Sequence, residues 1–205
     1  MNDQDLAPGG GGSEPGGGSE PGGGSEAGEQ RPRASDFRFR RPVEADYARV
    51  APLIDDWWNA RAAASLLPHL WFRHFTGTSW IAEVDRETDG PGPAPTARVV
   101  GFLVGYLAPD DPGLAVCHAV GVDSNLRRRG LGRALYGRFF EDARVAGARR
   151  VEAVGAPDDQ ACVRFHQALG FRPDDGPGSQ RLYGVAAFEA YDFGREDRVR
   201  FGRDL

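Results

Sequence analysis

The sequence predicts a mixed α/β fold, in which helices cover a central sheet of parallel and antiparallel strands. Two patterns support this prediction. In the first half of the chain, short apolar segments alternate with period two and are separated by Gly/Pro-rich turns, as in an antiparallel meander. From about residue 115 onward, apolar strands alternate with helical segments, as in a β-α-β-α unit. A sheet that combines both patterns is mixed.

The first half of the domain is expected to contribute four strands and two helices. The first strand, 37–40, alternates with period two and ends before Pro42. The helix over 44–58 places its apolar side chains on one face at helical spacing. The remaining elements are a helical stretch over 61–75 that Pro68 interrupts, strands over 79–84, 97–107 and 115–122, a Gly/Pro-rich loop over 88–96 and a turn over 109–113.

The second half is expected to continue with a helix, a strand and a second helix. The helix over 130–146 has apolar residues at three-to-four spacing and ends at Gly147, a typical residue after a helix C-terminus. A short strand follows over 150–154, and the helix over 159–169 ends at Gly170. After a Gly/Pro loop, the alternating segment 198–201 is the last predicted strand.

Residues 1–35 differ in composition from the rest of the chain. They hold 11 of the 29 glycines, in a repeating Ser-Glu-Pro-Gly-Gly-Gly pattern, and a net charge of −4 out of −5. So few apolar side chains cannot offset the entropy of ordering, so we expect a disordered tail that acts as a spacer. Docking through the repeated Ser-Glu-Pro is the alternative. Residues 36–205 are then one domain with a net charge near −1.

Composition excludes several classes of protein. The near-neutral domain argues against nucleic-acid and anionic-membrane partners, which require a basic excess or a basic face. No apolar run approaches the ~18–20 residues of a membrane span, and no signal peptide is evident. The two cysteines, Cys117 and Cys162, fit a reduced cytoplasmic protein. Their neighbours lack metal-ligand spacing, so we expect no bound metal.

Glycine and arginine residues gather after the strand predicted over 115–122. A polar loop leads from Val122 into a helix that begins near Gly130. The first amides of a helix have no intrahelical partner and suit a phosphate. Gly130 and Gly132 would let such a group approach the backbone. The arginines that add positive potential are Arg127, Arg128, Arg129 and Arg133.

Other phosphate-binding motifs do not fit this turn. A dinucleotide fingerprint requires a third glycine where Leu135 stands, and a P-loop requires a lysine, which the chain lacks. A merely solvated arginine cluster is the alternative. However, cations are unfavourable at a helix N-terminus. The cluster therefore favours a polyanionic ligand.

Two segments match motifs of one known family. Arg127-Arg128-Arg129-Gly130-Leu131-Gly132 is similar to an Arg/Gln-x-x-Gly-x-Gly/Ala motif, and Val122-Asp123 precedes it. The segment 159–171 is similar to Asn-x-x-Ala-x-x-Phe-Tyr-x-x-x-Gly-Phe. Both motifs resemble the GNAT superfamily of acyl-CoA-dependent N-acetyltransferases, over about 37–171. The resemblance implies the GNAT fold: a central mixed, mostly antiparallel sheet flanked by helices, with a β-α-β-α unit that binds acetyl-CoA.

The resemblance also implies a cosubstrate and a reaction. Acetyl-CoA would lie in a V-shaped opening between two parallel strands and transfer its acetyl group directly to a primary amine. The backbones of Val120 and Val122 would pair with the pantetheine arm, and the amides of 128–133 would hold the pyrophosphate. The expected coenzyme-binding residues are Val120, Val122, Arg127, Arg128, Arg129, Gly130, Leu131, Gly132, Arg133 and Asp159, which stands at the asparagine position of the family.

Two histidines stand where relatives carry catalytic residues. His118 takes the place of a glutamate on the central strand, and His166 that of a tyrosine. Since the pKa of histidine lies near ~6.5, both can move protons at neutral pH. We expect His118 to act as the base, directly or through water, and His166 to protonate the coenzyme thiolate. The alternatives are a satisfied strand histidine for His118 and simple packing beside Cys162 for His166.

The acceptor is expected to bind near the end of the first helix, where relatives build the acceptor pocket. Asp55, Asp56 and Trp58 would hold a cationic amine through ion pairs and cation–π contacts. Solvated aspartates beside a core tryptophan are the alternative. We expect a small-molecule amine as the acceptor and a monomer or homodimer. The alternative functions are a protein N-terminal or lysine acetyltransferase, and a catalytically silent acyl-CoA sensor or interaction module.

Overall fold

The structure is a computed structural model that describes residues 36–58, 63–85, 97–192 and 194–205. The tail predicted over 1–35, the loop predicted over 88–96 and the start of the helical stretch predicted over 61–75 therefore lie outside the described residues. Among the described residues, no helix has the length and apolar character needed to cross a membrane.

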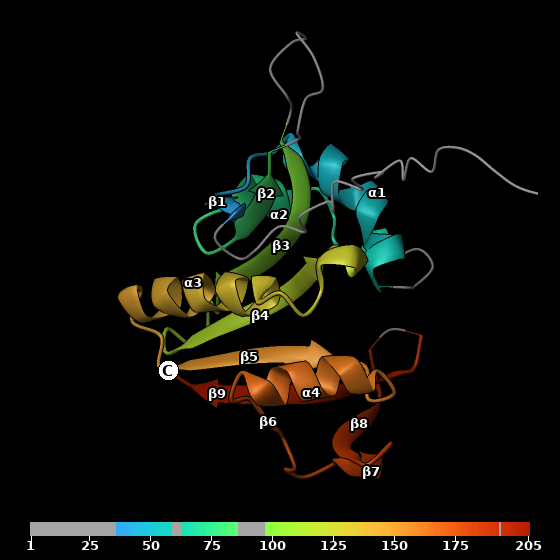
Figure 1. Cartoon of the computed structure of the whole chain (residues 1–205). Helices are drawn as coiled ribbons and strands as arrows, with labels where there is room; N and C mark the ends of the chain where they lie inside the picture. Colours follow the sequence, from blue (N-terminus) through green and yellow to red (C-terminus); the bar gives the residue numbers. More distant parts are fainter. Residues whose placement is uncertain (1–35, 59–62, 86–96, 193) are drawn as a thin grey trace, which may run out of the picture. The chain divides into compact units, whose positions relative to one another are not determined.

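A mixed sheet runs through the described residues (Figure 1). In chain order its strands are β1 Arg38–Arg40, β2 Trp80–Val84, β3 Arg98–Leu107, β4 Leu114–Val122, β5 Arg150–Gly155, β6 Arg172–Pro173, β7 Gln180–Leu182, β8 Val185–Asp192 and β9 Glu196–Asp204. Their order in space is β1, β2, β3, β4, β5, β9, β8 and β7, with β6 beside β9. The pairing of β4 with β5 is parallel and the other pairings among these strands are antiparallel. The predicted mixed, mostly antiparallel sheet is confirmed.

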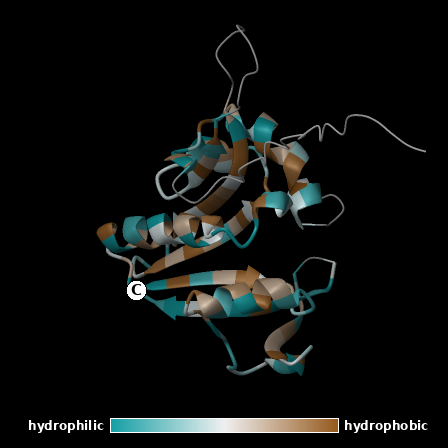
Figure 2. Ribbon diagram, viewed as in Figure 1, coloured by the Kyte–Doolittle hydropathy of each residue, from teal (hydrophilic) through white to brown (hydrophobic). Residues whose placement is uncertain are grey.

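Helices cover both faces of this sheet. They are α1 Asp46–Trp58, the 3₁₀ helix η2 Ala63–Leu66, α2 Leu70–His74, the 3₁₀ helix η3 Ser124–Leu126, α3 Leu131–Val145 and α4 Gln160–Ala168. The apolar sides of α3 and α4 join one buried cluster, and those of α1 and α2 join a second. The adjacent residues Phe102 and Leu103 of β3 belong to different clusters, because successive strand side chains point to opposite faces. Figure 2 shows the corresponding distribution, with β3 largely apolar and both α1 and α3 carrying apolar and polar residues.

The predicted elements agree with the structure up to residue 171, apart from their ends. The interrupted helical stretch is η2 and α2, with Pro68 between them. The C-terminal part differs, because β6, β7 and β8 were not predicted. β6 and β7 are only two and three residues long. β8 is irregular, since Ala190 adopts a φ of 48° and the register with β9 shifts.

β4 contains one extra residue, His118. Val104 of β3 pairs with Ala119, whereas Gly105 pairs with Cys117, so His118 is the unpaired residue of a β-bulge. The bulge reverses the side-chain alternation along β4. Cys117 therefore packs in the cluster of α3, while Ala119 packs in the cluster of α1. The side chain of His118 is half-buried between these two positions.

Beyond the bulge, β4 and β5 separate. Their parallel pairing extends only from Leu114–Arg150 to Cys117–Ala153, after which β5 continues beside β9. Figure 1 shows the two strands diverging toward their C-terminal ends. The amide of Asp123 donates to the Val100 carbonyl of β3 at 2.9 Å. Because backbone groups alternate in direction along a strand, the amides and carbonyls of Val120 and Val122 point away from β3, toward the opening.

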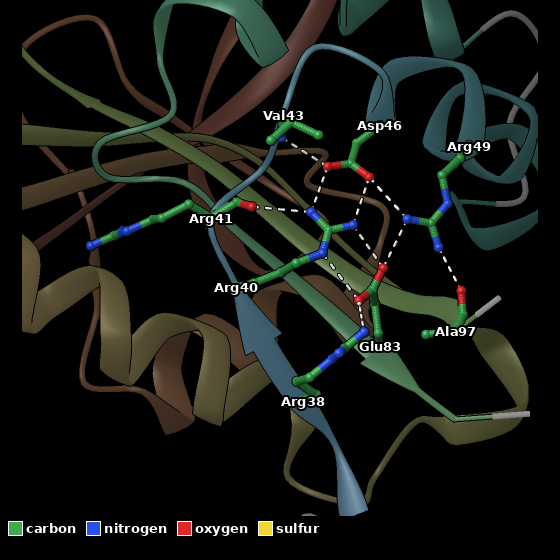
Figure 3. A network of polar contacts seen from close by, with 8 residues as sticks. All are labelled: Arg38, Arg40, Arg41, Val43, Asp46, Arg49, Glu83 and Ala97. Atoms are coloured by element: carbon green, nitrogen blue, oxygen red, sulfur yellow. Dashed lines mark hydrogen bonds and ion pairs between the residues drawn. The ribbon is translucent and has the colours of Figure 1, made fainter. Parts of the chain in front are cut away.

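A network of charged side chains connects β1, β2 and the start of α1 (Figure 3). The carboxylates of Asp46 and Glu83 are buried, with 2% exposure each, and three arginines surround them. Arg40 lies 2.6 Å from Asp46 and 2.7 Å from Glu83, and Arg49 bridges the same two carboxylates at 3.0 and 2.8 Å. Burial alone would raise the pKa of Glu83, but the hydrogen bonds from Arg40 and Arg49 outweigh it and lower the pKa to about 2.

This network makes the stability of the fold depend on pH. A carboxyl group whose pKa is lowered in the folded state stabilises the protein above its unfolded pKa of about 4.3, and this contribution is lost as the pH falls toward the folded pKa. We expect Glu83→Gln to lower the free energy of unfolding at pH 7 by about 3 kcal/mol, since it removes one of the two buried negative charges that three arginines share. The variant should also lose less stability than the wild type between pH 5 and pH 2, as measured by urea unfolding.

Glu141→Gln is the matched control for this experiment. Glu141 is 71% exposed and lies 3.9 Å from Arg144, so its pair is expected to contribute little. Equal pH dependence of Glu83→Gln and the wild type would contradict the assignment of acid sensitivity to this network.

Candidate active site

The turn between β4 and α3 passes through the short helix η3 before α3 begins. Asp123 caps η3 by accepting a hydrogen bond from the Asn125 amide at 2.9 Å. After η3, Arg128 and Gly130 adopt left-handed conformations, with φ of 64° and 83°. Left-handed residues in a turn can direct neighbouring amides toward a shared position that suits an anion. α3 begins directly after this turn, at Leu131.

The two glycines of this turn have different surroundings. A Cβ on Gly130 would meet no atom within 4 Å, so the space before the turn is open, but its φ of +83° strains any other residue. A Cβ on Gly132 would lie 2.9 Å from the Phe165 ring of α4. The sequence analysis expected both glycines to admit a phosphate. In the structure Gly132 also has a packing role, because the absence of a Cβ lets α3 and α4 approach each other.

The arginines of the turn are held in part by backbone carbonyls. Arg127 donates to the carbonyl of Trp57 at the end of α1, and Arg133 donates to the Ala168 carbonyl at 3.2 Å. Arg128 is exposed and Arg129 is half-buried. The four arginines lie within seven residues of one another at the start of α3, where the first amides of the helix have no intrahelical partner. This arrangement fits the diphosphate of a coenzyme.

The open edge of β4 adjoins this turn. Trp58 donates from its Nε1 to the Val120 carbonyl at 3.0 Å. The residue expected to bind the acceptor, Trp58, is therefore in contact with a residue expected to bind the coenzyme, Val120. Val122 is half-buried on the same edge. Asp159 caps α4, where its Oδ1 accepts from the amides of Ala161 and Cys162 at 3.0 and 2.9 Å. These observations give Asp159 a structural role and leave the backbone edge of β4 as the expected partner of an extended ligand.

His118 lies at the bulge, against the helices of the other face. Its Nε2 is 2.8 Å from the Leu66 carbonyl, and its ring stacks on Trp71, with the centroids 4.1 Å apart and the planes at 21°. Burial lowers the pKa of His118, and the hydrogen bond with Leu66 opposes this effect. The imidazole is therefore neutral at neutral pH, which is the state that a general base requires.

His166 lies inside the protein, with 3% exposure. Its Nδ1 is 2.9 Å from the Cys162 carbonyl and its Nε2 is 2.9 Å from the Tyr136 hydroxyl. The ring also stacks on Phe201 at 4.6 Å. Because both ring nitrogens have partners and the side chain is enclosed, this geometry favours packing, the alternative considered in the sequence analysis, over proton delivery to a thiolate.

The acceptor residues predicted on α1 are only partly brought to this site. Trp58 contacts the open edge of β4, whereas Asp55 and Asp56 are exposed. Trp57 is buried and stacks on Phe102 at 6.1 Å.

An aromatic group formed by Trp71, Phe75 and Tyr106 lies beside His118 and was not predicted from the sequence. The rings of Phe75 and Tyr106 lie 4.4 and 5.6 Å from that of Trp71. The only sequence signal for this group is the density of aromatic residues over 71–75.

Strands that separate after a parallel pairing and lead into a turn rich in glycine and arginine are the features expected of an acyl-CoA-dependent transferase. Residues 42–171 match the Acetyltransferase (GNAT) family, and the chain belongs to this family. The fold, the cosubstrate acetyl-CoA and the activity of an N-acetyltransferase follow for this chain.

The curated proteins similar to this chain include several diaminobutyrate acetyltransferases. The chain is 29% identical over 149 residues to the L-2,4-diaminobutyric acid acetyltransferase of Nocardia farcinica, covering 73% of this chain and 72% of the relative. It is 30% identical to that of Streptomyces coelicolor, with 75% and 85% covered. A diaminobutyrate acetyltransferase from Paenibacillus lautus, solved with its substrate and coenzyme A, superposes with a TM-score of 0.53 at 22% identity, over 81% of this chain and 94% of that chain.

Proposed function

We propose that this N-acetyltransferase acetylates a primary amino group of a small diamino acid, with L-2,4-diaminobutyric acid as the leading candidate. The observation that carries the proposal is the match to two diaminobutyrate acetyltransferases over about three quarters of the chain, 73% and 75%. The neutral histidine at the bulge of β4 supports it, because the ammonium group of such an acceptor must lose a proton before it can react.

In the proposed site, the backbone holds the coenzyme. When bound, acetyl-CoA supplies an activated acetyl thioester. The amides at the start of α3 and the arginines of the turn bind its diphosphate, and the open edge at Val120 and Val122 receives its pantetheine arm. These groups would orient the thioester beside the bulge.

His118 is proposed to move the proton in this reaction. The neutral imidazole takes a proton from the acceptor ammonium, which frees the nitrogen lone pair. The amine nitrogen then bonds to the acetyl carbon and the carbon–sulfur bond breaks. The leaving thiolate takes the second proton of the nitrogen, directly or through water, and the proton on His118 passes to solvent. The products are an amide, a free thiol and one proton.

The acceptor is proposed to lie between α1 and the aromatic group of α2. Asp55 and Asp56 are exposed near the end of α1, where they can attract the second ammonium group of a diamino acid. We also propose that the protein is cytoplasmic, which the free cysteines Cys117 and Cys162 support. The proposed oligomeric state is a monomer or a homodimer.

A panel of acceptors tests the proposed substrate, with thiol release from acetyl-CoA as the readout. L-2,4-diaminobutyrate is expected to give a kcat/KM at least about 10-fold above L-2-aminobutyrate, which lacks the second amine, and 1,3-diaminopropane, which lacks the carboxylate. Faster acetylation of a peptide N-terminus or a peptide lysine than of any small amine would refute the proposal.

A further inference from the structure

Trp71 occupies the centre of an aromatic group that borders the bulge of β4. Its ring contacts Phe75 on the C-terminal side of α2, Tyr106 on β3 and His118 on β4. The contact with His118 is the closest of the three, at 4.1 Å between centroids, and it is nearly parallel. One face of the imidazole is therefore covered by the indole.

The hydrogen bond with Leu66 fixes which nitrogen of His118 carries the proton. A backbone carbonyl can only accept, so the neutral ring donates from Nε2 to the Leu66 oxygen at 2.8 Å. Nδ1 then carries the lone pair. No partner of Nδ1 is present among the described residues, and these residues contain no buried side-chain nitrogen or oxygen without a hydrogen bond. Nδ1 is therefore accessible from outside.

We propose that Trp71 is a positioning residue for His118. Its indole holds the imidazole in the orientation in which Nε2 donates to Leu66, so that Nδ1 is the nitrogen that takes the proton of the acceptor amine. The inference rests on the proposed base role of His118 and adds the residue that orients the base and the atom that reacts. In the step itself, one N–H bond of the ammonium breaks, its electron pair stays on the amine, and a new N–H bond forms at Nδ1.

The surroundings of His118 are apolar, which gives Trp71 a measurable effect. The nearby elements present Arg73 and His74 on α2 and the Tyr106 hydroxyl on β3. None of these groups is among the causes of the lowered pKa of His118, which are burial and the opposing Leu66 hydrogen bond. Since the indole supplies part of that burial, its removal should raise the pKa toward that of an exposed histidine, near 6.5.

Substitutions at Trp71 test this inference with two readouts. We expect Trp71→Ala to raise the pKa of His118, measured by NMR titration of its imidazole carbon-bound proton. The apparent pKa on the acidic side of the pH profile of kcat/KM should rise by the same amount. At pH 8, kcat should fall roughly 10- to 100-fold, since the base is no longer held in place. Trp71→Phe keeps a flat ring and should restore both readouts most of the way.

Trp80→Phe is the matched control. Trp80 lies on β2 and donates from its Nε1 to Asp142 at 2.7 Å, away from His118, so neither readout should change. If Trp71→Ala does not fold, Trp71→Leu carries the same expectation, because leucine retains apolar bulk without a stacking face.

Three outcomes are decisive. An unchanged NMR pKa and kcat in folded Trp71→Ala or Trp71→Leu would overturn the positioning role. Equal losses in Trp71→Phe and Trp71→Ala would overturn it as well, because a flat ring stacked on the imidazole would then not be what holds His118 in place. A shift in the NMR pKa without a shift in the kinetic profile would show that Trp71 orients the ring but that His118 is not the base, which refutes the proposed mechanism and not the stacking contact.

Discussion

Replacing Gly130 by valine is expected to weaken acetyl-CoA binding at least about 100-fold. Gly130 has a φ of +83°, which a β-branched residue adopts only with strain. The turn must then rearrange, and its amides no longer point toward a shared position. Loss of two hydrogen bonds to a charged group, at roughly 1.5–3 kcal/mol each, corresponds to a factor of about 100 or more. Isothermal titration calorimetry with acetyl-CoA measures the change.

Gly137→Val is the control for this substitution. Gly137 lies in α3, and a Cβ there would also meet nothing within 4 Å, but its φ is not positive. Both variants add the same side chain in open space and differ in the backbone conformation. The control should bind acetyl-CoA within about two-fold of the wild type, and it should not destabilise α3, because valine has a higher helix propensity than glycine. Normal binding by Gly130→Val would refute the role of the turn.

Replacing His118 by alanine is expected to lower kcat about 100-fold or more at pH 7, while the affinity for acetyl-CoA stays within a few-fold. Without a base, the reaction depends on the small fraction of acceptor amine that is already deprotonated. The rate of the variant should therefore keep rising with pH beyond the range in which the wild type reaches its plateau. Steady-state kinetics with thiol detection between pH 6 and pH 9.5 compares the two profiles.

Two other histidines provide reference variants for this experiment. His74 is exposed on α2, so His74→Ala should leave the profile unchanged. His166→Phe removes the acceptor of the Tyr136 hydroxyl and should lower the free energy of unfolding by about 1–3 kcal/mol with little effect on kcat. A large loss of kcat in folded His166→Phe would instead support proton delivery by His166, and an unchanged kcat in His118→Ala would exclude His118 as the base.

Local patterns were sufficient to predict most of the fold and the turn. The strands up to β5 and the helices α1, α3 and α4 are long enough for their periodicity to be visible in the sequence. The glycine and arginine residues before α3 predict an anion-binding turn because their conformational and electrostatic effects are local, and the structure places a turn with two left-handed residues there. The short strands β6 and β7 carry too few residues for a period, and the register shift in β8 removes its alternation.

Features that depend on pairing across the sheet were not predictable. The segment Leu114–Val122 alternates regularly, and nothing in it reveals that His118 is the extra residue of a bulge. The contact of His118 with the Leu66 carbonyl joins residues 52 positions apart. For the same reason, Gly132 resembled a phosphate-binding glycine in sequence, although its neighbour in space is the ring of Phe165.

The edge of β4 beyond its pairing with β5 has a consequence for how this chain can diverge from its relatives. A ligand that pairs with the amides and carbonyls of Val120 and Val122 takes the place of a missing strand, and main-chain groups are the same whatever side chains surround them. Substitutions at these positions can therefore accumulate without changing the pattern of donors and acceptors. Recognition of this kind is compatible with identities of only 29% and 30% to the diaminobutyrate acetyltransferases, because the geometry of the strand is retained while its residues drift.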